Sequence, residues 1–266
     1  MDAPGVGNAQ CSTHALSPTA MFPLDPALVV AAVVVFLIAG LVKGVIGLGM
    51  PTVVMGLLTI VMPPAAAANL LLLPTVLTNL WQLLPASTFW PLLRRLAGLL
   101  IGLFVGAMFN GLPALGEGYG WAQHALGAIL AVYGAWGLAG RRLPAPGRHE
   151  VWLSPLVGYT TGAITAATGI FVFPLVPYVQ SLQMDKDRLV QAMGIIFCAA
   201  TLALTLRLGA SGVLHTANVL ASLVYLLPAA LGMWAGQIVR RRVSEAAFKR
   251  AFFVGVLLLG VYMFFS

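Results

Sequence analysis

The chain has 266 residues, of which 60% are hydrophobic and 8% are charged, and its mean hydropathy is +0.97. A soluble globular protein carries roughly 25% charged residues to cover its surface, so this composition excludes a soluble fold. The formal net charge of +7 does not indicate nucleic-acid binding. Its basic residues stand in short loops between apolar runs, where orientation in a membrane explains them.

Ten apolar segments, taken in chain order, predict membrane helices. They span 27–48, 51–62, 66–84, 94–110, 121–139, 152–168, 170–182, 188–206, 216–239 and 249–265. Long runs separated by Gly, Pro and Arg clusters favour helices over the alternating strands of a barrel. Most are long enough to cross about 30 Å of hydrocarbon, but 51–62 and 170–182 cover only about 18–20 Å and predict half-helices. We therefore predict an all-α integral membrane protein.

The basic residues also predict orientation. If the N-terminus lies outside and each segment crosses once, all of the Lys and Arg residues except Arg207 fall at or near the cytoplasmic side. The chain then divides into a flexible N-terminal tail (1–26), a first membrane repeat (27–140), a cytoplasmic link (141–150) and a second membrane repeat (151–266). Because each repeat holds five segments, the second enters the membrane inverted and both termini lie outside.

The two halves correspond weakly but in register. The matched positions are Gly40/Gly158, Gly44/Gly162, Gly47/Thr165, Met62/Met184, Asn69/Gln191, Asn79/Thr201, Gly102/Gly232, Gly106/Gly236 and Tyr133/Tyr262. Inverted repeats with broken segments at matching positions are a recurring design of transporters.

The stretch AGLVKGVIGLGMP (39–51) predicts an interruption. Gly47 and Gly49 allow backbone angles that other residues avoid, and Pro51 suits the first turn of a new helix. Its partner in the second half is GYTTGAITAATGIFVFP (158–174). Broken helices leave unpaired amides and a positive dipole end that suit an anion. The alternative is close helix packing through small residues, which we favour for Gly102/Gly106 and Gly232/Gly236.

Lys43 and two polar helix faces complete the candidate site. Lys43 either binds an anion directly or extends to the membrane interface, and the sequence leaves both open. One polar face carries Asn69 and Asn79, and the other carries Gln191 and Thr201. Such faces also serve as contacts between helices. The candidate substrate-binding residues are Lys43, Gly44, Gly47, Gly49, Asn69, Asn79, Thr165, Thr168, Gly169, Gln191 and Thr201.

The glycine pattern resembles that of the TauE/SafE sulfite exporter family over about 28–265. The residues that carry the resemblance are Gly40, Gly44, Gly47, Gly49, Gly158, Gly162, Gly169 and Pro174. The sequence departs from the family pattern at Met50, Pro51, Gly56, Thr165, Ala167 and Thr168. The resemblance implies transport of small sulfur-containing or organic anions, such as sulfite, sulfonates or related carboxylates, across a bacterial inner membrane.

The leading hypothesis is a secondary transporter, most simply an exporter, whose substrate is a small anion. The lipid bilayer surrounds the transporter. The alternatives are an anion channel and a membrane-embedded regulatory or structural subunit. The sequence contains no Walker A motif, which argues against an ATP-driven pump. No His, Asp or Glu lies centrally in a segment, which argues against an enzyme, a metal or a cofactor. A coupling ion is expected but not identified, and a homodimer is left open.

Overall fold

The computed structural model describes residues 26–83, 86–113, 115, 119–141 and 143–266, so the predicted tail lies outside the described residues apart from Pro26. All regular elements of the described chain are helices, and it contains no strand. The first half forms α1 (Pro26–Ile46), α2 (Met50–Leu58), α3 (Pro64–Leu80), η1 (Trp81–Leu83), α4 (Ala86–Met108) and α5 (Tyr119–Ala139). The second forms η2 (Gly147–His149), α6 (Glu150–Thr168), α7 (Leu175–Ser181), α8 (Lys186–Ala210), α9 (Thr216–Ala221), η3 (Ser222–Tyr225), α10 (Leu226–Arg242) and α11 (Glu245–Phe265).

Three predicted segments differ most from the structure. Helix α4 begins eight residues before the predicted 94–110, because Arg94 and Arg95 lower the local hydropathy without breaking the helix. The predicted segment 170–182 is helical only from Leu175, since Gly169 ends α6 in a left-handed conformation. The predicted segment 216–239 is divided into α9, η3 and α10.

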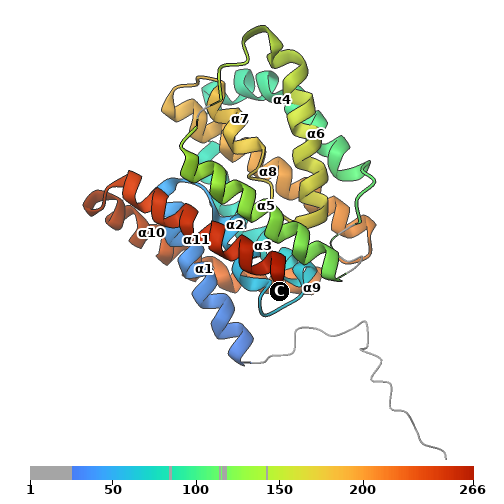
Figure 1. The fold of residues 1–266 in the computed structure, drawn as a ribbon, viewed down its shortest axis with the longest axis vertical. Helices are drawn as coiled ribbons and strands as arrows, with labels where there is room; N and C mark the ends of the chain where they lie inside the picture. Colours follow the sequence, from blue (N-terminus) through green and yellow to red (C-terminus); the bar gives the residue numbers. More distant parts are fainter. Residues whose placement is uncertain (1–25, 84–85, 114, 116–118, 142) are drawn as a thin grey trace, which may run out of the picture.

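The long helices pack in pairs that join the two halves. Helix α1 packs along α10, α6 along α4, and α11 along α5. Figure 1 shows α11 and α5 side by side. The first two pairs meet through glycines: a Cβ added at Gly40 would lie 2.1 Å from the Ala229 backbone oxygen, and one at Gly158 would lie 2.1 Å from that of Leu99. The first helix of each half therefore packs against the fourth helical segment of the other half. The inverted orientation of the halves stays a prediction.

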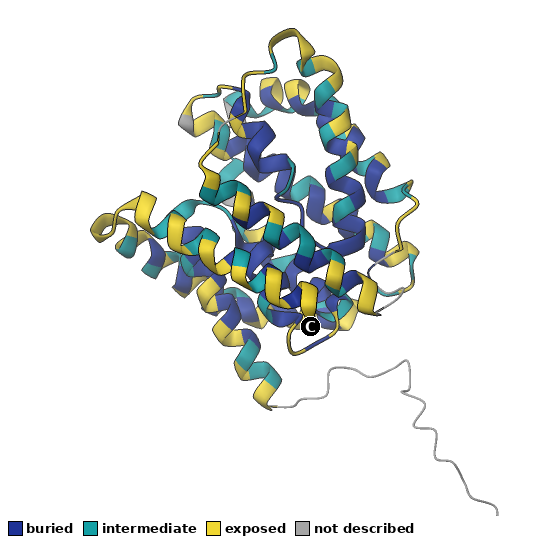
Figure 2. Ribbon diagram, in the orientation of Figure 1, coloured by how far each residue is buried: buried dark blue, intermediate teal, exposed yellow. Residues whose placement is uncertain are grey.

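Burial is concentrated on the short central helices. Eight of the nine residues of α2 are buried, whereas in α11 the buried residues are Val256, Gly260 and Met263. Figure 2 shows the exposed residues along the outer faces of α10 and α11. Among the described residues, five helical stretches are long and apolar enough to cross a membrane: Pro26–Ile46, Thr88–Met108, Asp187–Ala210, Thr216–Arg242 and Glu245–Phe265. An apolar exterior around a buried centre is the pattern of a multi-pass membrane protein.

Candidate anion-binding site

The predicted interruption between α1 and α2 is confirmed. Helix α1 ends at Ile46, and Gly47 and Gly49 take φ values of 87° and 104° before α2 begins at Met50. Side chains other than glycine rarely adopt these angles, so the two glycines make the break possible. The Gly47 amide still donates to the Lys43 carbonyl over 2.7 Å. The break therefore lies one helical turn after Lys43.

Lys43 points into the helix bundle. The residue is 4% exposed, and its ammonium group donates hydrogen bonds to the Thr78 hydroxyl oxygen, over 2.9 Å, and to Oδ1 of Asn79. The Thr78 hydroxyl donates its own proton to the Pro74 carbonyl over 2.7 Å, which leaves its oxygen free to accept from Lys43. The side chain does not extend to the membrane interface, which was the alternative that the sequence left open.

The charge of Lys43 meets only neutral acceptors. The described ion pairs join Arg95 to Glu150, Arg188 to Asp185 and Lys249 to Glu245, and none of them includes Lys43. A buried cation without a paired carboxylate is costly, so its presence among the described residues indicates a functional role.

Asn79 adds unused hydrogen-bond donors beside this cation. An ammonium group only donates, so Asn79 turns its oxygen toward Lys43 and its amide nitrogen away. That nitrogen, Nδ2, is buried and has no hydrogen-bond partner within the part of the chain that is described. One turn earlier on α3, the buried Thr75 hydroxyl has none either. The third ammonium proton and the Asn79 amide therefore form a donor set that suits an anion.

The second break lies against α2. Gly169 takes a φ of 72°, and a Cβ added there would lie 2.7 Å from the Met55 methyl group. The Thr165 and Thr168 hydroxyls donate to carbonyls four residues earlier in α6, each over 2.7 Å, and Thr168 also accepts from the Ile170 amide over 3.3 Å. Helix α2 thus connects the two breaks, while these hydroxyls serve to end α6.

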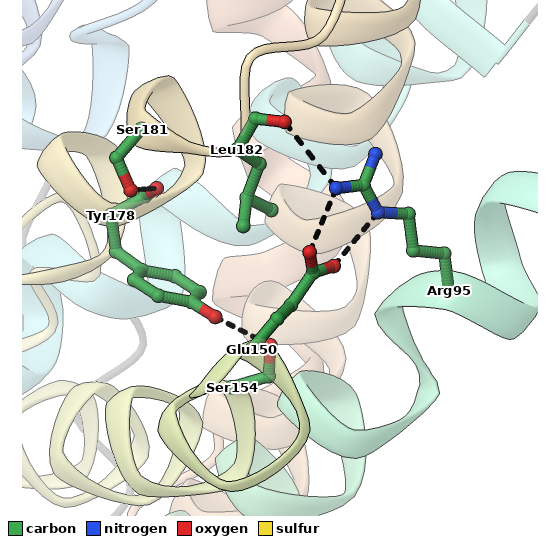
Figure 3. Close-up of polar contacts among 6 residues, drawn as sticks. All are labelled: Arg95, Glu150, Ser154, Tyr178, Ser181 and Leu182. Carbon is green, nitrogen blue, oxygen red and sulfur yellow. Dashed lines mark hydrogen bonds and ion pairs between the residues drawn. The ribbon is translucent and has the colours of Figure 1, made fainter. Parts of the chain in front are cut away.

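Arg95 fixes the end of α7, a role that the sequence did not reveal. From α4 it forms a two-point ion pair with Glu150 of α6, with N···O distances of 2.7 and 2.8 Å, and donates to the Leu182 carbonyl over 3.3 Å (Figure 3). The Tyr178 and Ser154 hydroxyls share a hydrogen bond of 2.7 Å, which joins α7 to α6. The short helix after the second break is therefore attached to both α4 and α6.

The other predicted residues lie elsewhere. Gly44 faces α10, where an added Cβ would be 2.3 Å from the Met233 backbone oxygen. Asn69 donates to the Val213 carbonyl over 3.1 Å and accepts from the His215 amide over 3.0 Å, which joins α3 to the turn after α8. The Thr201 hydroxyl donates to a carbonyl of its own helix. None of these contacts reaches Lys43.

Gln191 repeats the arrangement of Asn69 in the other half. Its amide nitrogen donates to the Leu83 carbonyl over 2.6 Å, and its oxygen accepts from the Thr88 hydroxyl over 2.7 Å, which joins α8 to η1 and α4. The two residues correspond in the sequence, and each holds a segment that follows the other's helix. Their described contacts favour a structural role over substrate binding.

We expect Gln191→Leu to lower the free energy of unfolding by about 2 kcal/mol, because it leaves the Leu83 carbonyl and the Thr88 hydroxyl without this partner. Thermal unfolding of the detergent-purified protein measures this change. The matched control is Thr205→Val, which removes a hydrogen bond within α8 and should lower stability by less than about 0.5 kcal/mol. Equal stability of Gln191→Leu and the unsubstituted protein would contradict the structural role.

Interrupted membrane helices beside a buried cation are features of secondary transporters. The family model described as Sulfite exporter TauE/SafE matches residues 32–263. The chain therefore belongs to the TauE/SafE sulfite exporter family, as its glycine pattern predicted, and it is a membrane transporter. Neither the search of curated proteins nor that of solved structures returned a match.

Proposed function

We propose that the protein is a secondary carrier that exports small sulfur-containing or organic anions, such as sulfite, sulfonates or related carboxylates, across a bacterial inner membrane. The observation that carries the proposal is the pair of unused donors at Lys43 and Asn79, buried where no described carboxylate competes for them. Sulfite and sulfonate groups present three oxygen acceptors, which match a donor set of one ammonium proton and one amide.

The bound anion neutralises Lys43 while the two neutral acceptors keep the ammonium group in place. Charge-assisted hydrogen bonds are about twice as strong as neutral ones, so two such contacts suffice for recognition. With one cation and no second fixed charge, the site binds the anion without holding it too tightly for release. The break at Gly47, one turn away, gives this region the backbone freedom that a rearrangement during transport requires.

The proposed direction of export assumes that the helix ends rich in basic residues face the cytoplasm, so the orientation of the chain in the membrane matters. Gln123, near the start of α5, donates to the Ser266 hydroxyl over 3.2 Å, and the link containing Ala145 follows the far end of α5. Positions 266 and 145 therefore belong to opposite ends of a helix about 30 Å long. The positive-inside rule then predicts that position 266 faces out.

In a cysteine-free background, we expect Ser266→Cys to react with a membrane-impermeant maleimide on intact cells. Ala145→Cys should react only after the membrane is made permeable. The measurement is gel detection of the labelled protein, and the unsubstituted cysteine-free protein is the control. The reverse labelling pattern would overturn the predicted orientation.

Flux into proteoliposomes tests the transport function. We expect saturable uptake of radiolabelled sulfite or of the sulfonate isethionate, accelerated when unlabelled substrate is present on the opposite side. Flux that rises linearly with concentration and shows no such acceleration would favour the channel. If sulfite, isethionate and acetate all show no flux above that of protein-free liposomes, the proposed function fails.

A further inference from the structure

A cavity of about 440 Å³ lies beside the first break. Ile46, Gly47 and Leu48 at the break form part of its wall. The rest comes from α5 and the residues just after it, and from α7, α8, α10 and α11. Its volume is typical of a small-ligand pocket. Lys43, Thr78 and Asn79 do not line it, so the cavity does not include the Lys43 cluster.

The lining of the cavity is positively charged. Arg141, Arg240 and Lys249 contribute three basic side chains, and Glu245 contributes one acidic side chain, which pairs with Lys249 over 2.7 Å. A concave surface with one sign of charge concentrates ions of the opposite sign. All four residues belong to helix ends that the positive-inside rule places in the cytoplasm.

Tyr133 places a buried hydroxyl behind the wall of the cavity. It lines the cavity and is 2% exposed, yet its hydroxyl has no hydrogen-bond partner in the described chain. Phe253 packs edge-on against its ring, with ring centroids 5.3 Å apart, and itself lines the cavity. A buried hydroxyl without a partner costs stability, so an acceptor that reached this hydroxyl from the cavity would be bound favourably.

We infer that this cavity is a second anion site, in which the Tyr133 hydroxyl donates to the substrate oxyanion and Arg141 and Arg240 attract it, before the anion passes the first break to Lys43. This inference rests on the proposed function, because the ligand is the same small oxyanion. It adds a loading site on the side predicted to be cytoplasmic. Transport would then use two successive sites, one near the mouth of the pathway and one within the bundle.

The test compares transport from each side of the membrane. We expect Tyr133→Phe to raise the KM for radiolabelled sulfite about tenfold in inside-out vesicles, where the cytoplasmic side faces the medium, since one charge-assisted hydrogen bond is lost. The KM in right-side-out vesicles and the maximal rate should be retained. The control is Tyr262→Phe, because Tyr262 is the corresponding residue on α11 and is 59% exposed; it should leave both KM values unchanged.

Arg240→Gln provides a second variant at an exposed position, where folding is not at risk. We expect it to raise the same KM and to weaken the dependence of that KM on salt concentration. An unchanged KM in well-folded Tyr133→Phe would overturn the loading site while leaving the proposed function intact. If Tyr133→Phe does not fold, an unchanged KM in Arg240→Gln overturns it. No sulfite or isethionate flux in the unsubstituted protein would remove both the proposed function and this inference.

Discussion

Asn79→Asp is expected to abolish anion flux while the protein remains folded. The new carboxylate would lie against the Lys43 ammonium, where Oδ1 of Asn79 now accepts a hydrogen bond, and would take the place of the substrate anion. A transported anion would have to displace a buried ion pair, which costs several kcal/mol, so we expect flux to fall by about a hundredfold or more. Initial rates of radiolabelled sulfite uptake into proteoliposomes measure this fall.

The stability of the same variant separates a binding role from a structural one. Because Lys43 gains a counter-charge, the melting temperature of Asn79→Asp should equal or exceed that of the unsubstituted protein. The matched control is Asn110→Asp, the same substitution at the end of α4, where the side chain caps carbonyls of its own helix. That variant should retain flux. Normal flux in Asn79→Asp would show that the anion binds elsewhere.

Gly102→Ala is expected to destabilise the protein by about 3 kcal/mol, an unusually large effect for one added methyl group. The new Cβ would lie 2.2 Å from the Pro155 backbone oxygen, and a backbone atom cannot move aside as a flexible side chain does. Helices α4 and α6 would have to separate. The corresponding change Gly232→Ala, with a Cβ 2.1 Å from the Leu37 oxygen, should have a similar effect on α10 and α1.

Thermal unfolding in detergent and the yield of monodisperse protein measure both substitutions. The control is Gly255→Ala in α11, where no atom outside the adjoining backbone of that helix lies within 4 Å of an added Cβ and alanine favours the helix. It should keep or slightly raise the melting temperature. If Gly102→Ala has the same melting temperature as Gly255→Ala, the close packing of α4 on α6 is not required for stability.

The sequence predicted the helical bundle and the first break because both depend on local signals. Apolar runs report burial in lipid, and Gly47, Gly49 and Pro51 report backbone geometry directly. The start of α7 was not predicted, since the non-helical residues 170–172 are apolar and resemble a helix in composition. The start of α4 was predicted too late, at Arg94. The cause is that hydropathy does not distinguish a helical turn containing Arg94 and Arg95 from a loop.

The candidate site was predicted in part. Lys43 and Asn79 were both named, but they are 36 residues apart, and only the tertiary fold brings their side chains into contact. Arg95 was interpreted as an orientation signal, since its contact with Glu150 joins residues 55 positions apart. Tyr133 was named only for its correspondence with Tyr262, because a buried hydroxyl without a partner cannot be recognised without tertiary structure.

The glycine contacts between the halves also limit which parts of the protein can move. Backbones that touch at Gly40 and Ala229, or at Gly158 and Leu99, leave no side-chain layer along which one helix can slide past the other. Each pair, α1 with α10 and α4 with α6, is therefore expected to behave as one rigid body that contains a helix from each half. Opening Lys43 to the opposite side of the membrane then requires these bodies to tilt against each other, with bending confined to the two breaks.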